Sequence, residues 1–396
     1  MEYRVLINKI LRRLREIFSH KYLVGKISSG YSYYVNFNNF AKYTIVEELK
    51  FDFVSQVCYI GDEEREEIKV QLREKYLLEI DDCYVIGGSN AIYTNGYIIH
   101  DNVVFAEKSE RITDRGLFRI YNGAVHLGNR YVINYLQRGQ EIDSAINLCG
   151  NYSSNLYHFV YEILSKFYIL SKVEIAQDVP ILLDYSAKHI PQFAELVELF
   201  SNHRSIIYAN PEELVYINHC YHLSQCHTIP MNYKDMKLCS SADVKFDRVV
   251  LRFLRDHILS LATMDVEFPK RFFISRKSTK WRSYNEDEVI EVVNDFGFTV
   301  VYPEEMTYQQ QVSMFHNAEY IIAASGAALT NIISCRPGCR VLTLISTRID
   351  LSIFSTIAAA FGIDLKYMNG VITNEQNVQS DFRIDCVKLK EYLGNE

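Results

Sequence analysis

The sequence predicts an α/β protein that consists of two doubly wound halves. Apolar strands alternate with helices from residue 147 onward, and a second, clearer alternation begins at residue 271. Between the two sets, residues 236–265 have a helical centre and can serve as a linker. Strands that alternate with helices form parallel sheets through crossover connections. We therefore expect an amino-terminal domain over residues 1–240 and a carboxyl-terminal domain over residues 241–396.

The elements of both halves follow from apolar spacing and from helix-boundary signals. Asn285 with Glu288 forms a capping box before one helix, which Gly297 ends. Thr307 with Gln310 forms a second capping box. In the first half we expect helices at 153–171 and 191–200 and strands at 179–183, 205–208 and 214–223. In the second half we expect strands at 272–275, 298–302, 320–323 and 340–345 and helices at 286–295 and 308–317.

The amino terminus is basic and amphipathic. Residues 1–21 contain six lysines and arginines against two glutamates, a net charge of +4, and their apolar residues recur every three to four positions. A helix of this kind can lie on an anionic membrane surface. It can equally pack its apolar stripe on its own domain, since such stripes usually face a core.

Residues 51–105 show a different pattern, with short runs of alternating apolar residues. Asn95-Gly96 separates two such runs, which is typical of a tight hairpin. We interpret this region as a β-meander attached to the first domain. It contains no residues that indicate chemistry, so we expect its role to be architectural.

Composition and charge narrow the class of protein. The 396 residues are 48% hydrophobic and 23% charged, with a formal net charge of -7, which argues against global disorder and against nucleic-acid binding. Nine cysteines without a C-x-x-C pair indicate reduced thiols. The sequence has neither 18 consecutive apolar residues nor a secretory signal. We expect a cytoplasmic protein, with the inner face of the cell membrane as the place of any peripheral contact.

Three loops of the second half combine cations, carboxylates and small residues. They follow its first three strands and span residues 275–282, 303–305 and 325–331. Ligands of open α/β sheets bind at the carboxyl ends of the strands, so these loops should line one site. Cations and a helix amino terminus suit a phosphate, while Glu304 or Glu305 can accept hydrogen bonds from ribose. The expected nucleotide-binding residues are Ser275, Arg276, Lys277, Arg282, Glu304, Glu305, Ser325, Gly326, Ala327, Thr330 and Asn331.

Several common motifs are absent from the sequence. It has no G-x-G-x-x-G, no P-loop and no G-x-S-x-G, which argues against a dinucleotide oxidoreductase, a P-loop NTPase and a hydrolase of the nucleophile-elbow type. It also has no D-x-D, so a metal-bridged diphosphate site has no obvious ligands. We therefore expect no metal and no cofactor, with cations and main-chain groups holding the phosphates.

Two ordered motifs resemble the signature of glycosyltransferase family 61. In the second half they are Ile274-Ser275-Arg276, Arg282, Asn285-Glu286, Gln311, Phe315, Gly326-Ala327, Leu329-Thr330-Asn331 and Pro337-Gly338. In the first half, Asn155-Leu-Tyr-His158-Phe-Val-Tyr-Glu162 resembles the family's N-x-x-H-x-x-x-[DE] helix. The resemblance covers residues 147–346. It implies a GT-B fold, in which two Rossmann-like domains face a cleft.

The resemblance also implies an activity. Such an enzyme is an inverting hexosyl- or pentosyltransferase that moves a sugar from a nucleoside diphosphate, most often UDP, to a hydroxyl of a glycan or lipid-linked glycan acceptor. It needs no obligatory metal and acts in surface or capsular polysaccharide biosynthesis. The family commonly shows His-Gly-Ala-Gly where this chain has Ser325-Gly326-Ala327-Ala328. This departure motivates an alternative, a non-catalytic member that binds a glycan or a partner protein.

His158 and Glu162 are the candidate catalytic pair, because residues four apart share one face of a helix. An inverting displacement needs a base for the acceptor hydroxyl. Imidazole titrates near neutral pH, so His158 is the better candidate and Glu162 would orient it. Glu162 as the direct base and a purely structural pair both remain open. Asn155 and Tyr157, beside the pair, are the expected acceptor-binding residues.

A cluster of histidines and cysteines follows at residues 219–227. Its members are His219, Cys220, His222, Cys226 and His227. Adjacent residues of a strand point to opposite faces, and the spacing differs from that of known zinc sites. We therefore interpret them as ordinary strand residues near the cleft. The three histidines would be the alternative bases if the His158 and Glu162 pair were structural.

Overall fold

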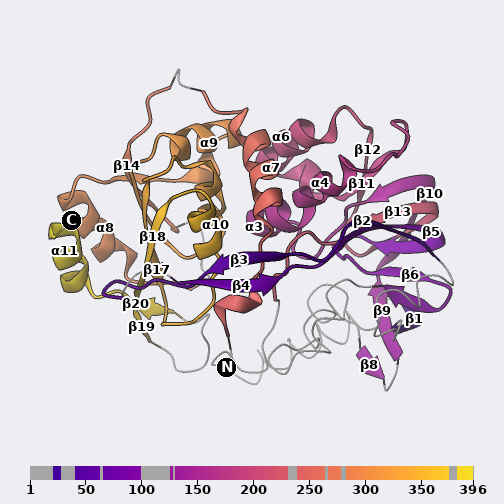
Figure 1. Ribbon diagram of the computed structural model, residues 1–396, viewed down its shortest axis with the longest axis horizontal. Coiled ribbons are helices and arrows are strands. Elements are labelled where there is room, and N and C mark those ends of the chain that lie inside the picture. The colour runs from indigo at the N-terminus through magenta and orange to yellow at the C-terminus, as the bar shows by residue number, and fades with distance from the viewer. Residues whose placement is uncertain are drawn as a thin grey trace, which may run out of the picture.

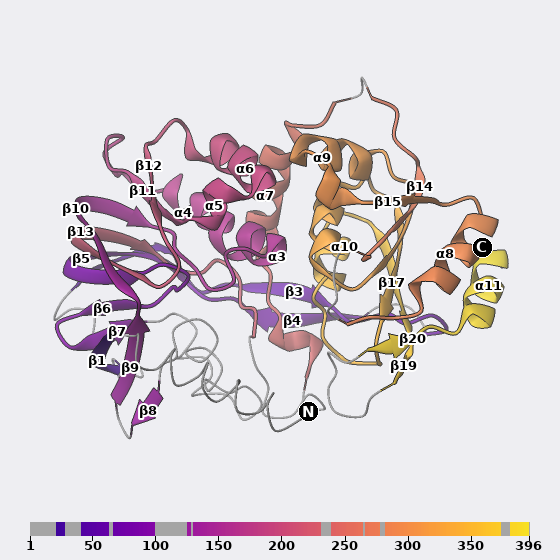
Figure 2. The same ribbon diagram turned by 180° about the vertical axis from the view of Figure 1, so that it is seen from behind.

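The computed structural model describes residues 21–27, 41–62, 66–99, 125–127, 130–230, 239–263, 266–277, 282–373 and 381–395. Two large β-sheets lie at opposite ends of the molecule, with helices between them (Figures 1 and 2). The expected α/β class with parallel sheets is confirmed.

The first sheet has eleven strands within the described residues. Its parallel part consists of β12 (Ile206–Ala209), β11 (Ile181–Asp184), β10 (Gln137–Asn147) and β13 (Glu213–Leu223), in this spatial order. The antiparallel strand β5 (Lys75–Ile86) pairs with β13 and extends the sheet. The other strands are β6 (Ile92–Thr94), β7 (Tyr97–Ile99), β1 (Lys21–Ile27), β9 (Arg130–Tyr135), β8 (Val125–Leu127) and β2 (Ala41–Glu47).

The second sheet has five strands, and all of them are parallel. They lie in the order β15 (Thr299–Val301), β14 (Arg271–Ile274), β16 (Tyr320–Ala324), β17 (Arg340–Ile345) and β18 (Asp364–Asn369). The side chains of β16 are buried throughout, as expected for a strand with helices on both faces. The chain leaves β14 toward one edge of the sheet and β16 toward the other. Their carboxyl ends therefore form a topological switch point, where open α/β sheets bind ligands.

A layer of helices fills the space between the two sheets (Figures 1 and 2). It contains α3 (Leu156–His158), η2 (Phe159–Ile163), η3 (Leu164–Lys166), α4 (Phe167–Leu170), α5 (Ser186–His189), α6 (Pro191–Ser201), α7 (Arg248–Leu259), α9 (Tyr308–His316), η7 (Ala327–Ser334) and α10 (Ser355–Ala360). One cluster of buried apolar side chains includes Phe159 of the first half, Leu254 of α7 and Phe315 of the second half. The two halves therefore share a hydrophobic core.

The outer face of the second sheet carries two further helices, α8 (Glu286–Asp295) and α11 (Cys386–Gly394). Phe273 of β14 packs there with Val289 of α8 and Leu389 of α11. The expected capping box of α9 is confirmed, because Thr307 and Gln310 bond to each other's main chain. The expected box of α8 is wrong. The Asn285 side chain instead accepts from the Ile384 main chain, tying α8 to the segment that precedes α11.

The region 51–105 divides into two parts. β5, β6 and β7 form the expected meander, and Asn95 and Gly96 turn between β6 and β7 with positive φ angles of 49° and 79°. β3 (Phe51–Ser55) and β4 (Glu67–Gln71) form a separate hairpin instead. The Ser55 N–H donates to Thr356 Oγ1 of α10 at 3.0 Å, so this hairpin packs on the second half. Both views show it below the helix layer (Figures 1 and 2).

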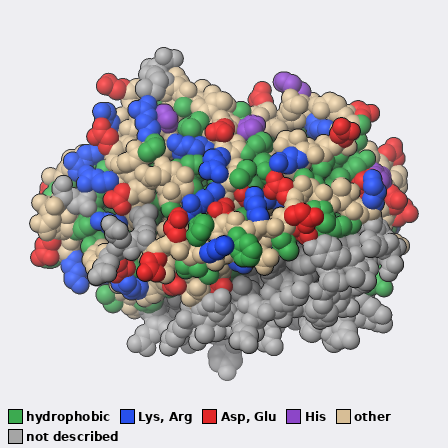
Figure 3. Space-filling view, in the orientation of Figure 1, with side chains coloured by type: hydrophobic (Ala, Val, Ile, Leu, Met, Phe, Trp, Pro, Cys, Tyr) green, Lys and Arg blue, Asp and Glu red, His purple; other side chains and the backbone are tan. Residues whose placement is uncertain are grey.

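The amphipathic helix expected at residues 1–21 lies outside the described residues, except that Lys21 begins β1. No helix of the described segments has the length and hydropathy to cross a membrane. On the face shown in Figure 3, lysine and arginine side chains lie interspersed with aspartate and glutamate. The described part of that face therefore carries no large field of one sign.

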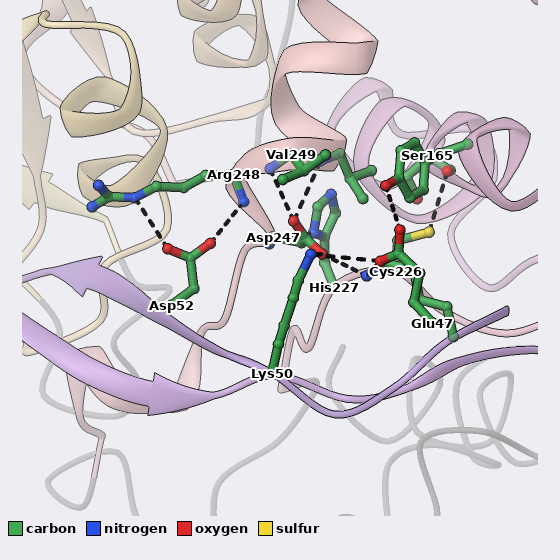
Figure 4. Close-up of polar contacts among 12 residues, drawn as sticks. Glu47, Lys50, Asp52, Ser165, Cys226, His227, Asp247, Arg248 and Val249 are labelled. Carbon is green, nitrogen blue, oxygen red and sulfur yellow. Dashed lines mark hydrogen bonds and ion pairs between the residues drawn. The ribbon is translucent and has the colours of Figure 1, made fainter. Parts of the chain in front are cut away.

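A buried ionic network joins the first sheet to the start of α7 (Figure 4). Lys75 donates to Asp247 at 2.5 Å and to Glu47 at 2.8 Å, and Lys50 pairs with Asp247 at 2.7 Å. Burial opposes the charged form of Lys75, but the two carboxylates hold the pKa of Lys75 above its usual value. Asp247 also accepts the Val249 N–H and thereby caps α7.

His227 lies against this network and stays neutral. Its Nδ1 accepts the Asp247 N–H at 3.1 Å, which places the proton on Nε2. Burial lowers the pKa of His227 to about 3. The unfolded chain takes up a proton below pH 6.5 that the folded chain does not, so folding stability must fall as the pH drops from about 6.5 toward 3.

We expect the free energy of unfolding to fall by about 2 kcal/mol between pH 6.5 and pH 4.5 because of His227 alone. Urea unfolding at both pH values measures this free energy for the wild type and for His227→Asn. Asparagine keeps an acceptor for the Asp247 N–H and does not titrate. The pH slope should flatten in this variant. The exposed His203→Asn should keep the wild-type slope, and an equally steep slope in His227→Asn would contradict the assignment.

Candidate functional site

The loops after β14 and β16 meet at the switch point of the second sheet. Arg276 Nη1 donates to the Ser325 carbonyl oxygen at 3.2 Å. A Cβ atom on Gly326 would lie 3.8 Å from Arg276 Cζ, so the guanidinium rests against the Ser325-Gly326 backbone. The expected convergence of these two loops is therefore present.

Arg282 lies at the same place and brings a second cation, and both arginines are partly buried. Burial lowers the pKa of Arg276, and burial together with the neighbouring Arg276 lowers the pKa of Arg282 to about 10. Arg282 Nε is buried without a hydrogen-bond partner in the described part of the chain, and its φ of 57° is unusual for a residue with a side chain. Two adjacent, partly buried guanidinium groups repel each other unless an anion compensates them.

Ser275 and Lys277 have local roles in this loop. The buried Ser275 accepts the Lys277 N–H through Oγ at 3.2 Å. The Arg276 N–H donates to Glu286 Oε1 at 2.6 Å, which fixes the loop to the start of α8. Lys277 is exposed and pairs with Asp287 at 2.8 Å. The cations nearest the switch point are therefore Arg276 and Arg282.

Thr330 and Asn331 differ from the expectation for nucleotide-binding residues. Both side chains are 0% exposed. Asn331 Nδ2 donates to Gln311 Oε1 at 2.8 Å, so this side chain ties η7 to α9. Both side chains are therefore closed to solvent in this arrangement, and a role of the two residues in nucleotide binding stays a prediction, whereas Ser325, Gly326 and Ala327 remain partly exposed.

Glu304 and Glu305 lie on the short helix η6 (Pro303–Glu305), and both are exposed. This helix meets the first half, because Gln192 of α6 donates to the Met306 carbonyl oxygen at 2.8 Å. In the described segments, neither glutamate has a hydrogen bond or ion pair with the two arginines. A contact with ribose stays a prediction.

The first-half motif forms the expected pair. His158 Nδ1 and Glu162 Oε1 are 3.0 Å apart, at the end of α3 and within η2. η2 is a π-helical turn, whose hydrogen bonds reach from i to i+5, and such turns are frequent at functional sites. The Tyr152 ring stacks on His158 at 4.9 Å and limits its orientation.

The two expected acceptor-binding residues have structural roles. Asn155 caps α3, since its Oδ1 accepts the Tyr157 N–H at 3.0 Å. Tyr157 is buried and packs edge-on against Tyr161 and Phe354. Its burial raises the pKa of its hydroxyl well above the usual range. The expectation is therefore wrong for Tyr157, and Asn155 is accounted for by the helix cap.

A hydrogen bond joins the first-half motif to the second-half loop. Tyr161, between His158 and Glu162 in sequence, donates from its hydroxyl to the Thr330 carbonyl oxygen at 3.0 Å. The helix with the His158 pair thus lies directly against η7, the helix that begins after Gly326. Tyr161 and Thr330 are 169 positions apart in sequence, so the two motifs that contain them are neighbours only in the fold.

Comparison with known families agrees with this geometry. Residues 156–342 match the family model Glycosyltransferase 61. The chain belongs to the glycosyltransferase 61 family. The match begins at α3 and ends in β17, so it contains both the His158 pair and the Arg276 loop. No curated protein matches the chain. The family makes this chain a glycosyltransferase, which acts on a sugar donor and a glycan acceptor.

In the glycosyltransferase, the histidine and cysteine side chains of residues 219–227 lie in different environments. His219 is partly exposed and contacts Asp81 at 2.6 Å, whereas Cys220 is buried in the core on the other face of β13. His222 and His227 are buried. Across the described ranges, no three histidine, cysteine, aspartate or glutamate side chains gather as metal ligands.

The sequence analysis missed Asp184 of the glycosyltransferase. This buried carboxylate ends β11 and accepts the N–H groups of Gly88 at 2.6 Å and Gly150 at 2.9 Å. Burial raises the pKa of Asp184, although these bonds favour its ionised form. An aspartate directly after a buried strand, at the edge where α/β sheets bind ligands, is the signal that could have identified it.

We expect His158→Ala and Glu162→Gln to lower the turnover number by about 10²- to 10⁴-fold if the pair supplies the general base. Donor affinity should change little, because the donor loops belong to the other half. Single-turnover kinetics and calorimetry with UDP separate these two effects. His203→Ala and Glu198→Gln, both exposed at α6, are the matched controls. Near-normal turnover in folded His158→Ala and Glu162→Gln would make the pair structural.

Proposed function

We propose that this glycosyltransferase moves a sugar from a UDP-sugar to a hydroxyl of a glycan or lipid-linked glycan acceptor, with inversion, in surface or capsular polysaccharide biosynthesis. The donor's diphosphate would occupy the switch point of the second sheet. The proposal is supported by Arg276 and Arg282, which lie partly buried next to each other where a ligand of such a sheet binds.

The two arginines match the charge demand of the reaction. As the bond to the sugar breaks, the leaving diphosphate gains negative charge, and preorganised cations stabilise it. Guanidinium groups bind phosphate oxygens through two parallel hydrogen bonds. Their mutual repulsion in the free enzyme becomes a favourable interaction once a dianionic group lies between them.

The His158 pair supplies the other half of the proposed reaction. In an inverting displacement the acceptor attacks the sugar carbon from the side opposite the leaving group, and a base removes the hydroxyl proton. The bonded contact of Tyr161 with Thr330 holds the helix of His158 beside the donor loop. Glu162, 3.0 Å from the imidazole, orients the ring and stabilises its protonated form after the transfer.

The proposal includes a GT-B-like arrangement, with the acceptor side in residues 1–240 and the donor side in residues 241–396. The parallel strands in both sheets and the helices between the sheets support it. The shared core across the boundary indicates that the halves pack firmly. The hairpin of β3 and β4 adds a contact from the acceptor side to the donor side.

We expect Arg276→Ala and Arg282→Ala each to weaken UDP binding by about tenfold or more, since a hydrogen bond to a charged group contributes about 1.5–3 kcal/mol. The double variant should show no binding in titration calorimetry. Lys270→Ala, an exposed cation before β14, is the control. Wild-type affinity in the double variant would place the phosphate site elsewhere.

The same titration in EDTA tests metal independence. The chain has no D-x-D, and the arginines provide the countercharge, so wild-type UDP affinity should persist in EDTA. Loss of binding that manganese restores would overturn this part of the proposal.

We further propose a cytoplasmic enzyme that contacts the inner face of the cell membrane through residues 1–21. Their net charge of +4 and apolar stripe support this placement. Each basic residue near an anionic surface contributes about 1 kcal/mol. A variant without residues 1–21 should lose co-sedimentation with anionic vesicles and keep UDP affinity. Unchanged sedimentation would favour packing of this segment on its own domain.

A further inference from the structure

A small pocket opens in the first half, at the carboxyl ends of β10 and β11. It has a volume of about 170 Å³, and its walls include Gly88, Ser153, Asp184 and Tyr185. A water molecule occupies about 30 Å³ in the liquid, so the pocket has the room of about six waters. This space suits one sugar ring and is too small for several rings.

Asp184 builds the walls of this pocket. Its side chain is 4% exposed and accepts the main-chain N–H groups of Gly88 and Gly150, which belong to two different loops. Ser153 also bonds to Asp184, and Ser186 donates to Ser153 at 3.1–3.2 Å. The carboxylate therefore holds two loops in place before any ligand arrives. Such preorganisation lowers the entropic cost of binding.

The lining of the pocket offers partners for both surfaces of a sugar ring. A pyranose has an apolar C–H face, which packs on aromatic rings, and a rim of hydroxyls, which need hydrogen-bond partners. Tyr185 lines the pocket and is 40% exposed, and its ring stacks on His189 at 5.9 Å. Ser154 and Ser186 bring hydroxyls to the same pocket.

The pocket includes the loop that leads into the helix of the candidate base. Ser153 and Ser154 precede the cap of α3, and His158 ends this helix. Three helical residues from Asn155 to His158 rise by about 5 Å along the axis. The Tyr152 ring, next to Ser153 in sequence, stacks on His158. A sugar in the pocket would therefore lie at the amino-terminal end of the helix that carries His158.

We propose that this pocket binds one sugar ring of the acceptor glycan, with the Tyr185 ring against its C–H face and the hydroxyls of Ser154 and Ser186 on its rim. The proposal rests on the proposed transfer to a glycan hydroxyl. It replaces Asn155 and Tyr157 as acceptor residues. Asp184 is a positioning residue in this site.

Saturation-transfer NMR tests the pocket with simple probes, the methyl glycosides of glucose, galactose and their 2-acetamido derivatives. At least one of them should receive saturation from the wild type. Tyr185→Ala removes the ring, and Ser154→Phe fills the pocket from an exposed position, so the signal should be lost in both. Tyr97→Ala, which removes an exposed tyrosine of β7, is the matched control and should keep the signal.

Calorimetry with UDP on the same proteins separates the two proposals. UDP affinity should be unchanged in Tyr185→Ala and Ser154→Phe, which also reports that the second half is folded. Two results would contradict the proposed sugar pocket while supporting the donor site. In one, the wild type binds UDP but gives no glycoside signal. In the other, the wild type binds UDP and the glycoside signal persists in both variants. A glycoside signal that both variants lose, in a wild type that does not bind UDP, supports the pocket and contradicts the proposed donor.

Discussion

The contact between the helix of α3 and η2 and the helix η7 sets the geometry of the whole site. The hydrogen bond from Tyr161 to the Thr330 carbonyl oxygen crosses this contact. It holds the histidine and glutamate pair of the first half beside the donor loop of the second half. The residues around this contact are buried, and they belong to a core common to both halves. The two halves cannot slide past each other without breaking this dense apolar contact. The packing of the core therefore fixes the distance between the base and the donor loop.

The second constraint is electrostatic. Arg276 and Arg282 are desolvated together in the free enzyme, at the one edge of the second sheet where the strand connections diverge. Burial of like charges stores unfavourable energy that the folded chain must offset elsewhere. An anion that enters between them relieves it, and this makes binding at that place selective for highly charged ligands.

Sequence patterns predicted the main strands and helices between residues 179 and 345, because apolar periodicity and caps such as Thr307 are local signals, but they predicted neither α10 nor β18 nor α11. They also predicted the pair of His158 and Glu162, whose contact depends on a single helix. They failed where burial decides the role of a residue. Thr330, Asn331 and Tyr157 carry polar groups that suit a ligand, yet tertiary packing turns them inward. Asp184 escaped notice because its partners, Gly88 and Gly150, are distant in sequence.

The hairpin of β3 and β4 belongs to the amino-terminal half by sequence but packs on the carboxyl-terminal half of this enzyme. Its Ser55 bonds to α10, and Tyr59 bridges to Tyr367 of β18, although both residues precede the first sheet's parallel strands in the chain. A recombinant fragment that starts at residue 241 would lack this cover and expose the buried surface of α10 and β18 to solvent. Modular exchange of donor domains between related enzymes would therefore have to move two separate segments of the gene together.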